Sequence, residues 1–78
     1  MSRLLVVDDN DDIRHLLKMR LQSAGHTVEL AQSAEQALAI VPTFQPHLVI
    51  TDLRMDGMDG MTLFEKLKFN QPSLPIII

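Results

Sequence analysis

The sequence contains no cysteine among its 78 residues and no long run of apolar side chains. The lack of cysteine excludes a disulfide framework, a thiolate metal site and a cysteine nucleophile. No stretch approaches the roughly 20 apolar residues that a membrane-spanning helix needs, and no signal peptide is recognisable. These absences predict a soluble, cytoplasmic domain that does not bind a membrane.

Positive charge is scarce as well. Seven lysine and arginine residues stand against ten aspartate and glutamate residues, so the formal net charge is −3. Because nucleic-acid-binding domains carry a basic surface, we expect this chain itself to bind no nucleic acid. An apolar fraction of 46% is enough for a globular core, and the length allows one small domain.

Short apolar runs alternate with amphipathic stretches, which is typical of strand–helix–strand units. The sequence predicts four strands, over residues 3–7, 27–31, 47–51 and 76–78. Three helices are predicted between them from the spacing of apolar residues. The expected inward positions are Ile13, Leu16, Leu17, Leu21 and Ala24 in the first helix, Ala34, Ala37, Leu38 and Val41 in the second, and Met61, Phe64 and Leu67 in the third.

The helix ends carry their own signals. Gly25 occupies the position of a left-handed cap after the first helix. Ser33 and Gln36 form a capping box that begins the second helix. Pro42 is expected at the end of that helix, and Pro46 keeps the following segment non-helical.

The order of these elements restricts the fold. Right-handed crossovers place the first helix on one face of a parallel sheet and the other two helices on the opposite face, with the strands in the order 2-1-3-4. We therefore predict an α/β fold of the flavodoxin-like, doubly wound class, in which residues 1–78 form one partial domain and no second domain is present. In such sheets ligands bind beyond the carboxyl ends of the strands where the winding reverses.

Aspartate is concentrated at that place, after the first and third strands. Seven of the ten acidic residues lie there, and all seven are aspartates: Asp8, Asp9, Asp11, Asp12, Asp52, Asp56 and Asp59. Neighbouring carboxylates repel one another unless a cation joins them or some become protonated, and aspartate oxygens suit Mg²⁺. The helix dipole explains Asp11 and Asp12. Because Asp8, Asp9 and Asp52 end buried strands, we predict a magnesium site at these three residues.

Other metal motifs fit the sequence poorly. Both acidic segments fail as EF-hand loops, because Arg54 replaces a ligand in one and Ile13 replaces the required glycine in the other. His15, His26 and His47 lack metal-ligand spacing, and each is expected on the surface or at a strand end.

The two acidic segments together resemble a known family. LLVVDDNDDIRHLL and LVITDLRMDGMDGMTLF are similar to the receiver domains of two-component response regulators. The resemblance rests on the acidic pair after the first strand, the aspartate that ends the third strand and the M-x-x-M-D-G loop. The segment LRMDGMDGM resembles more narrowly the receivers of nitrogen-regulator-type, enhancer-binding transcriptional activators.

The resemblance implies phosphorelay signal transduction rather than an enzyme. Asp52 would be the phospho-acceptor, receiving a phosphoryl group from a phosphohistidine on a sensor histidine kinase. The cofactor would be Mg²⁺, bound by Asp52, by Asp9 directly, by Asp8 through water and by the backbone carbonyl of Arg54. In the parent protein such a domain would control a transcription-regulating output domain.

The chain departs from the family's pattern in two respects. Asp56 stands where receivers usually have proline. The family's fifth strand, its switch serine or threonine and the lysine after that strand have no counterpart here, which implies a truncated domain. Because residues 76–78 are apolar without interruption, we expect a homo-oligomer through the edge of the fourth strand or the exposed sheet face.

Two other functions stay open. A haloacid-dehalogenase-type phosphatase also uses a strand-end aspartate and Mg²⁺, but it requires a second aspartate where this chain has Arg54, and Asp8 with Asn10 fits only loosely. The second alternative is that the chain is a non-functional truncated fragment that folds as an oligomer. A phosphatase turns over small phosphate esters, whereas a receiver retains a labile acyl phosphate.

Overall fold

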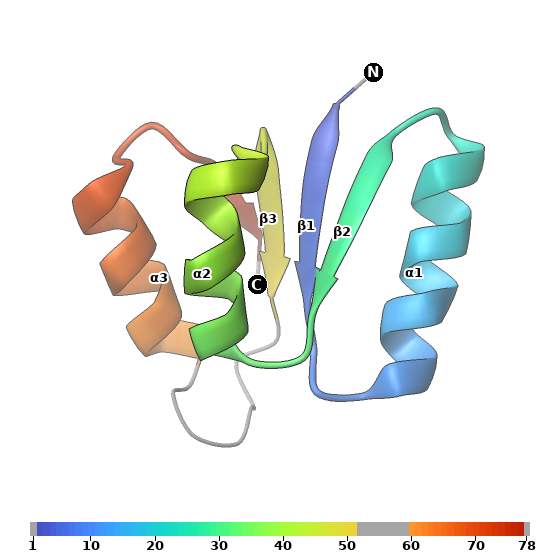
Figure 1. Cartoon of the computed structure of the whole chain (residues 1–78), viewed down its shortest axis with the longest axis horizontal. Helices are drawn as coiled ribbons and strands as arrows, with labels where there is room; N and C mark the ends of the chain where they lie inside the picture. The colour runs from blue at the N-terminus through green and yellow to red at the C-terminus, as the bar shows by residue number, and fades with distance from the viewer. Residues whose placement is uncertain (1, 52–59, 78) are drawn as a thin grey trace.

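A four-stranded parallel sheet forms the centre of the molecule (Figure 1). The computed structural model describes residues 2–51 and 60–77. The strands lie in the order β2-β1-β3-β4, so the predicted flavodoxin-like, doubly wound fold is confirmed. The elements are β1 (Arg3–Val7), α1 (Asp11–Ser23), β2 (Thr27–Ala31), α2 (Ala34–Phe44), β3 (Leu48–Thr51), α3 (Gly60–Asn70) and β4 (Ile76–Ile77).

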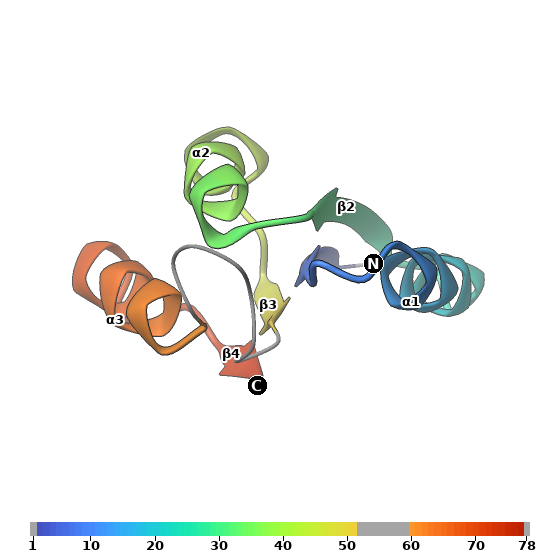
Figure 2. The ribbon, with the colours of Figure 1, turned by 90° about the horizontal axis from the view of Figure 1, so that it is seen from below.

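The helices lie on both faces of the sheet, as right-handed crossovers require. Figure 2 shows α1 beside β1 and β2 on one face, with α2 and α3 on the other. On the α1 face, none of the described helices covers β3 and β4. No helix within the described residues is long and apolar enough to cross a membrane.

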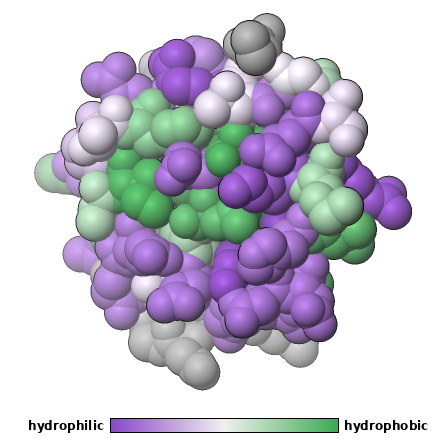
Figure 3. Space-filling view, turned by 45° about the vertical axis from the view of Figure 1, so that its right-hand side comes forward, coloured by the Kyte–Doolittle hydropathy of each residue, from purple (hydrophilic) through white to green (hydrophobic). Residues whose placement is uncertain are grey.

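The β2 strand forms one edge of the sheet, as predicted. Beside it lies an open hollow of about 460 Å³ whose lining residues come from β2 and α2: Glu29, Ala39, Ile40, Thr43 and Phe44. Figure 3, in which the right-hand side of Figure 1 is turned forward, shows hydrophobic residues gathered in the middle of a face and surrounded by hydrophilic ones.

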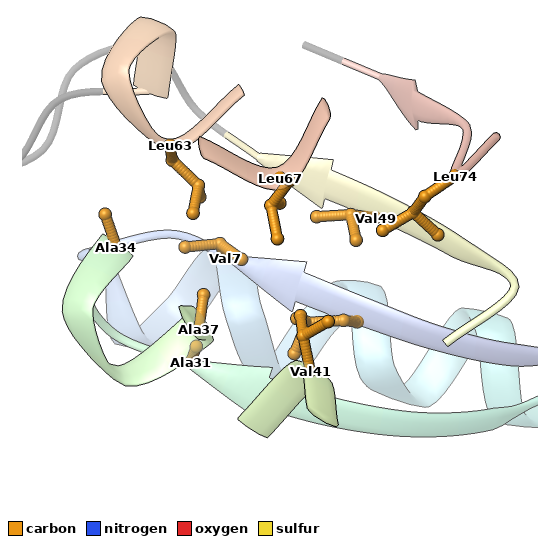
Figure 4. Packing of buried hydrophobic residues seen from close by; sticks show 10 residues of the cluster. Val7, Ala31, Ala34, Ala37, Val41, Val49, Leu63, Leu67 and Leu74 are labelled. Atoms are coloured by element: carbon orange, nitrogen blue, oxygen red, sulfur yellow. The ribbon is translucent and has the colours of Figure 1, made fainter. Parts of the chain in front are cut away.

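The central strand β1 contributes to two hydrophobic clusters. Its side chains alternate between the faces of the sheet, so Leu5 and Val7 pack on the side of α2 and α3 while Leu4 and Val6 pack on the side of α1. Figure 4 shows the larger cluster, which consists of Leu5, Val7, Ala31, Ala34, Ala37, Val41, Val49, Leu63, Leu67 and Leu74. The continuous apolar run of β1 is therefore explained by burial on both faces.

The α2 helix begins at the predicted cap, Ser33, but the return bond from Gln36 goes to the residue before the cap rather than to Ser33 itself. The Ser33 hydroxyl accepts a hydrogen bond from the backbone N–H of Gln36 at 3.1 Å, and the Gln36 side chain accepts one from the N–H of Gln32 at 2.7 Å. The predicted end at Pro42 is wrong, because the helix runs on to Phe44. Phe44 packs against the larger cluster, and this tertiary contact holds the final turn in place.

The α1 helix presents a narrower buried stripe than predicted. Leu17 and Leu21 pack against the sheet, whereas Ile13 and Leu16 are 44% and 50% exposed. Residues four positions apart lie one above the other on a helix, so a single row of side chains meets the sheet. Gly25 follows the helix with φ 95°, which confirms the predicted left-handed cap.

The α3 helix is rotated relative to the prediction. Leu63 and Leu67 are fully buried against the sheet, whereas Met61, predicted to face inward, is exposed. Phe64 is partly buried beside that row. The spacing of apolar residues in this helix is compatible with more than one inward face, and packing against β3 selects the face with Leu63 and Leu67.

Candidate functional site

Asp8 lies at the carboxyl end of β1, next to the point where the winding reverses between β1 and β3. The residue is buried, with 8% of its surface exposed. Its backbone N–H donates to the carbonyl of Ala31 at 3.1 Å, and its Oδ1 accepts from the N–H of Asn10 at 2.9 Å. Within residues 2–51 and 60–77, its other carboxylate oxygen has no hydrogen-bond partner.

The residues after Asp8 turn the chain into α1. Asp9 is exposed. Asn10 caps the helix, because its side-chain oxygen accepts from the N–H of Ile13 at 3.1 Å. Asp11 and Asp12 occupy the first helical turn, where their charges favour the positive end of the helix dipole as predicted. The helix therefore accounts for Asp11 and Asp12 but gives Asp9 no structural role.

Arg14 is a residue of this site that the sequence pattern did not reveal. Its side chain is buried although it carries a charge. Its Nη1 donates to the backbone carbonyl of Asp8 at 2.6 Å, and its Nη2 pairs with the Asp11 carboxylate. Arginine is seldom buried without partners, and the i, i+3 spacing of Asp11 and Arg14 is the one sequence signal for this arrangement.

The end of β3 lies beside the end of β1. Thr51 is buried and is the register partner of Val7. The chain therefore leaves adjacent strands at neighbouring positions, through Asp8 on one side and toward Asp52 on the other. The predicted phospho-acceptor Asp52 and the predicted carbonyl ligand Arg54 lie outside the described residues.

The carboxylates and histidines of the described chain do not form a complete metal site. Within residues 2–51 and 60–77, no group of three or more such side chains is placed to hold an ion. His26 and His47 instead accept hydrogen bonds from the backbone N–H groups of Ser2 and Arg3, at 3.4 and 2.9 Å. His26 and His47 lie directly before β2 and β3, and His15 is exposed on α1, so the predicted places at strand ends or on the surface are confirmed.

The sequence is similar to proteins of established families. The protein-family model described as "Response regulator receiver domain" matches residues 4–78 of the chain. The transcriptional regulatory protein GlrR of Escherichia coli (strain K12) is 44% identical over 77 residues, which cover 99% of this chain and 17% of GlrR. The virulence transcriptional regulatory protein PhoP of Shigella flexneri is 40% identical over 76 residues, or 97% of this chain and 34% of PhoP. The chain thus spans between 17% and 34% of the length of these relatives.

Solved structures share the fold. The response regulator protein TrrA from Thermotoga maritima, in complex with Mg²⁺ and BeF, superposes with a TM-score of 0.95 and 36% identity, over 100% of this chain and 68% of that chain. A response regulator receiver domain protein from Clostridium thermocellum gives a TM-score of 0.93 with 28% identity, over 97% of this chain and 62% of that chain. Both TM-scores exceed 0.9, which agrees with the predicted flavodoxin-like fold.

Proposed function

The chain belongs to the response regulator receiver domain family, and from this premise we propose that Asp52 accepts a phosphoryl group from a sensor histidine kinase in a Mg²⁺-dependent reaction. The observation that carries the proposal is the buried Asp8 at the end of β1, beside the strand that leads directly to Asp52. In the sequence an aspartate directly follows each of these two adjacent strands, and ligands in open α/β sheets bind beyond such strand ends.

The described residues fit the requirements of Mg²⁺. This ion prefers oxygen ligands and is usually held by one or two carboxylates together with water and a phosphate. Asp8 keeps one carboxylate oxygen for a ligand while Asn10 holds the other, and Asp9 is exposed beside it. We propose that Asp8, Asp9 and Asp52, with the carbonyl of Arg54, hold the ion. When bound, Mg²⁺ neutralises negative charge on the transferred group.

The residues of the chain then have distinct tasks. The Asp52 carboxylate attacks phosphorus in line, so that its O–P bond forms as the P–N bond of the phosphohistidine breaks. Asp8 is held by hydrogen bonds and does not need to reorganise when the ligand arrives. The chain keeps the phosphate as an acyl phosphate instead of releasing it at each turnover. We therefore propose a signalling role rather than an enzymatic one, in which the acyl phosphate controls a transcription-regulating output domain in the parent protein.

Metal binding gives a direct test of the site. In the Asp9→Asn variant we expect Mg²⁺ affinity to fall at least tenfold, because even outer-shell partners of a metal are worth about 10–100-fold. Asp9 is exposed, so the fold should be unaffected. The measurement is a Mg²⁺ titration followed by the NMR amide signals of residues 8–10.

The matched control for this titration is Asp12→Asn. Asp12 is also an exposed aspartate of the same segment, but it lies in the first turn of α1. We expect its affinity to stay within about twofold of the parent, since a single surface charge contributes little. Equal affinities for the parent chain and the Asp9 variant would show that the site is assigned to the wrong residues.

We also propose that the 78-residue chain forms a homo-oligomer through the sheet face that carries α1, near β4. Ile77 is 53% exposed there, and its register partner Ile50 is only partly buried, as is Leu48. Their register and the alternation of side chains place all three on the α1 face of β3 and β4. Figure 2 shows that no described helix covers this part of the sheet. Burying apolar surface contributes about 25 cal/mol per Å², which favours association with a second copy.

Sedimentation at low micromolar concentration tests the association. The parent chain should sediment as a dimer or larger species, and Ile77→Lys should shift it to the monomer by placing a charge in the interface. Ala39→Lys serves as the control, because Ala39 is exposed in the hollow beside β2, at the other edge of the sheet. A parent chain that is folded and monomeric, or a monomer produced by Ala39→Lys alone, would contradict the assigned face.

A further inference from the structure

We propose that Arg14 is a positioning residue for the metal site, which fixes the peptide unit between Asp8 and Asp9 and thereby sets the affinity for Mg²⁺. The inference rests on the proposed function, because it concerns the residues that would hold the ion. Its basis is the hydrogen bond of 2.6 Å from Nη1 of Arg14 to the backbone carbonyl oxygen of Asp8.

Within the described part of the chain, three hydrogen bonds restrain Asp8. Its backbone N–H is bound to Ala31 of β2, and its Oδ1 to the N–H of Asn10 in the same turn. Its carbonyl oxygen accepts from Arg14, four residues into α1. Only this third bond acts on the peptide unit that leads to Asp9. It therefore couples the position of α1 to the direction in which the Asp9 side chain leaves the backbone.

The Arg14 contact is strong enough for this task. A hydrogen bond from a charged donor is roughly twice as strong as a neutral one. The guanidinium is held on two sides, since Nη2 pairs with the Asp11 carboxylate, and Arg14 is only 7% exposed. A planar group fixed in this way loses little further freedom when it orders the carbonyl.

Electrostatics alone predicts the opposite effect on the metal. A guanidinium near a dication repels it, so its removal should strengthen Mg²⁺ binding if charge were its only influence. If Arg14 orders the peptide unit, its removal should weaken binding. The sign of the change therefore separates a positioning role from a purely electrostatic one.

The experiment compares three variants in the Mg²⁺ titration by NMR at constant ionic strength. Arg14→Met keeps a long buried side chain but removes the donor and the charge, and we expect about a tenfold loss of affinity. Arg14→Lys restores one cationic donor on a more mobile stem, and we expect it to recover part of that loss. Asp11→Asn removes the ion pair but leaves the carbonyl bond, and we expect a clearly smaller loss of affinity than in Arg14→Met, because the Asp11 side chain of this pair is largely exposed.

A second readout does not depend on the metal. The N–H of Asp9 belongs to the peptide unit whose carbonyl accepts from Arg14, so the Asp9 amide signal of the metal-free protein should shift in Arg14→Met and less in Asp11→Asn. If Arg14 had only a structural role, its replacement would lower the thermal stability without shifting the Asp9 amide signal more than other amide signals. If Arg14→Met does not fold, Arg14→Lys decides, with reduced affinity and a shifted Asp9 signal expected.

The two proposals fail in different ways. Mg²⁺ affinity that is unchanged or increased in Arg14→Met, or in Arg14→Lys where only that variant folds, overturns the role of Arg14. If Asp9→Asn still weakens binding, the metal site itself survives that result. A parent chain that binds no Mg²⁺, or that binds it equally well with Asp9→Asn, overturns the proposed site and the inference together.

Discussion

The Asp52→Asn variant is expected to gain no phosphate from acetyl phosphate and Mg²⁺, whereas the parent chain gains one phosphoryl group. The substitution keeps the size of the side chain but removes the anionic oxygen that attacks phosphorus, and an amide is not a substitute for this nucleophile. The variant should show no phosphorylation at all rather than phosphorylation at a reduced rate. In the proposed reaction, Asp52 is the one residue of this chain that forms a covalent bond to phosphorus.

Mass spectrometry of the intact chain measures this difference. Asp56→Asn serves as a control in the same acidic segment, and it should still be labelled. Equal labelling of the unsubstituted chain and the Asp52 variant contradicts the proposal. So does an unsubstituted chain that gains no phosphate after long incubation.

The same experiment separates a receiver from a phosphatase. A receiver ends with at most one phosphate per chain, and the label is lost on treatment with hydroxylamine because it is an acyl phosphate. A phosphatase releases many phosphates per chain from a small ester such as p-nitrophenyl phosphate. Sustained release that depends on Asp8 or Asp52 would favour the haloacid-dehalogenase-type alternative.

The Leu5→Ala variant is expected to lose about 2–5 kcal/mol of unfolding free energy. Leu5 lies in the central strand with 0% of its surface exposed, and its side chain belongs to the cluster shared with α2 and α3. The rigid sheet cannot close the resulting cavity. A chain of this length has about 4–12 kcal/mol of stability in total, so the substitution should remove a large part of it.

Urea denaturation followed by circular dichroism gives the unfolding free energies of the unsubstituted chain and of the Leu5→Ala variant. Leu16→Ala is the matched control, because it makes the same chemical change on α1 where the side chain is 50% exposed. Its effect should lie within about 0.5 kcal/mol, partly offset by the higher helix propensity of alanine. Equal losses at the two positions would contradict the burial of the β1 side chains.

The topology and the inward face of α2 were predictable from the sequence, but the rotation of α3 was not. Continuous apolar runs such as Leu4–Val7 require cover on both faces, and the handedness of crossovers leaves few arrangements. Within α3, Met61 and Leu63 are both apolar, and local spacing does not decide which of them meets the sheet. That choice depends on how the helix packs against β3.

The sequence predicted the aspartates of the candidate site, but it did not predict that an arginine belongs to the site. Asp8 and Asp9 stand out because acidic residues seldom follow a buried strand without a reason. Arg14, in contrast, has the sequence context of a solvent-exposed helical residue. Its burial results from a bond to the last carbonyl before the turn, which joins residues six positions apart. Such a contact appears only when α1 is set in place beside β1.

The backbone at Gly25 restricts the stereochemistry of the residue that follows α1. Its φ is 95°, yet a β-carbon built there would meet no atom within 4 Å. The position therefore has room for a side chain but disfavours the L configuration, for which such dihedral angles are costly except in asparagine and a few others. A D-alanine, whose preferred angles are the mirror image, would fit this position without strain. What limits sequence variation at the first helix–strand junction is thus chirality rather than volume.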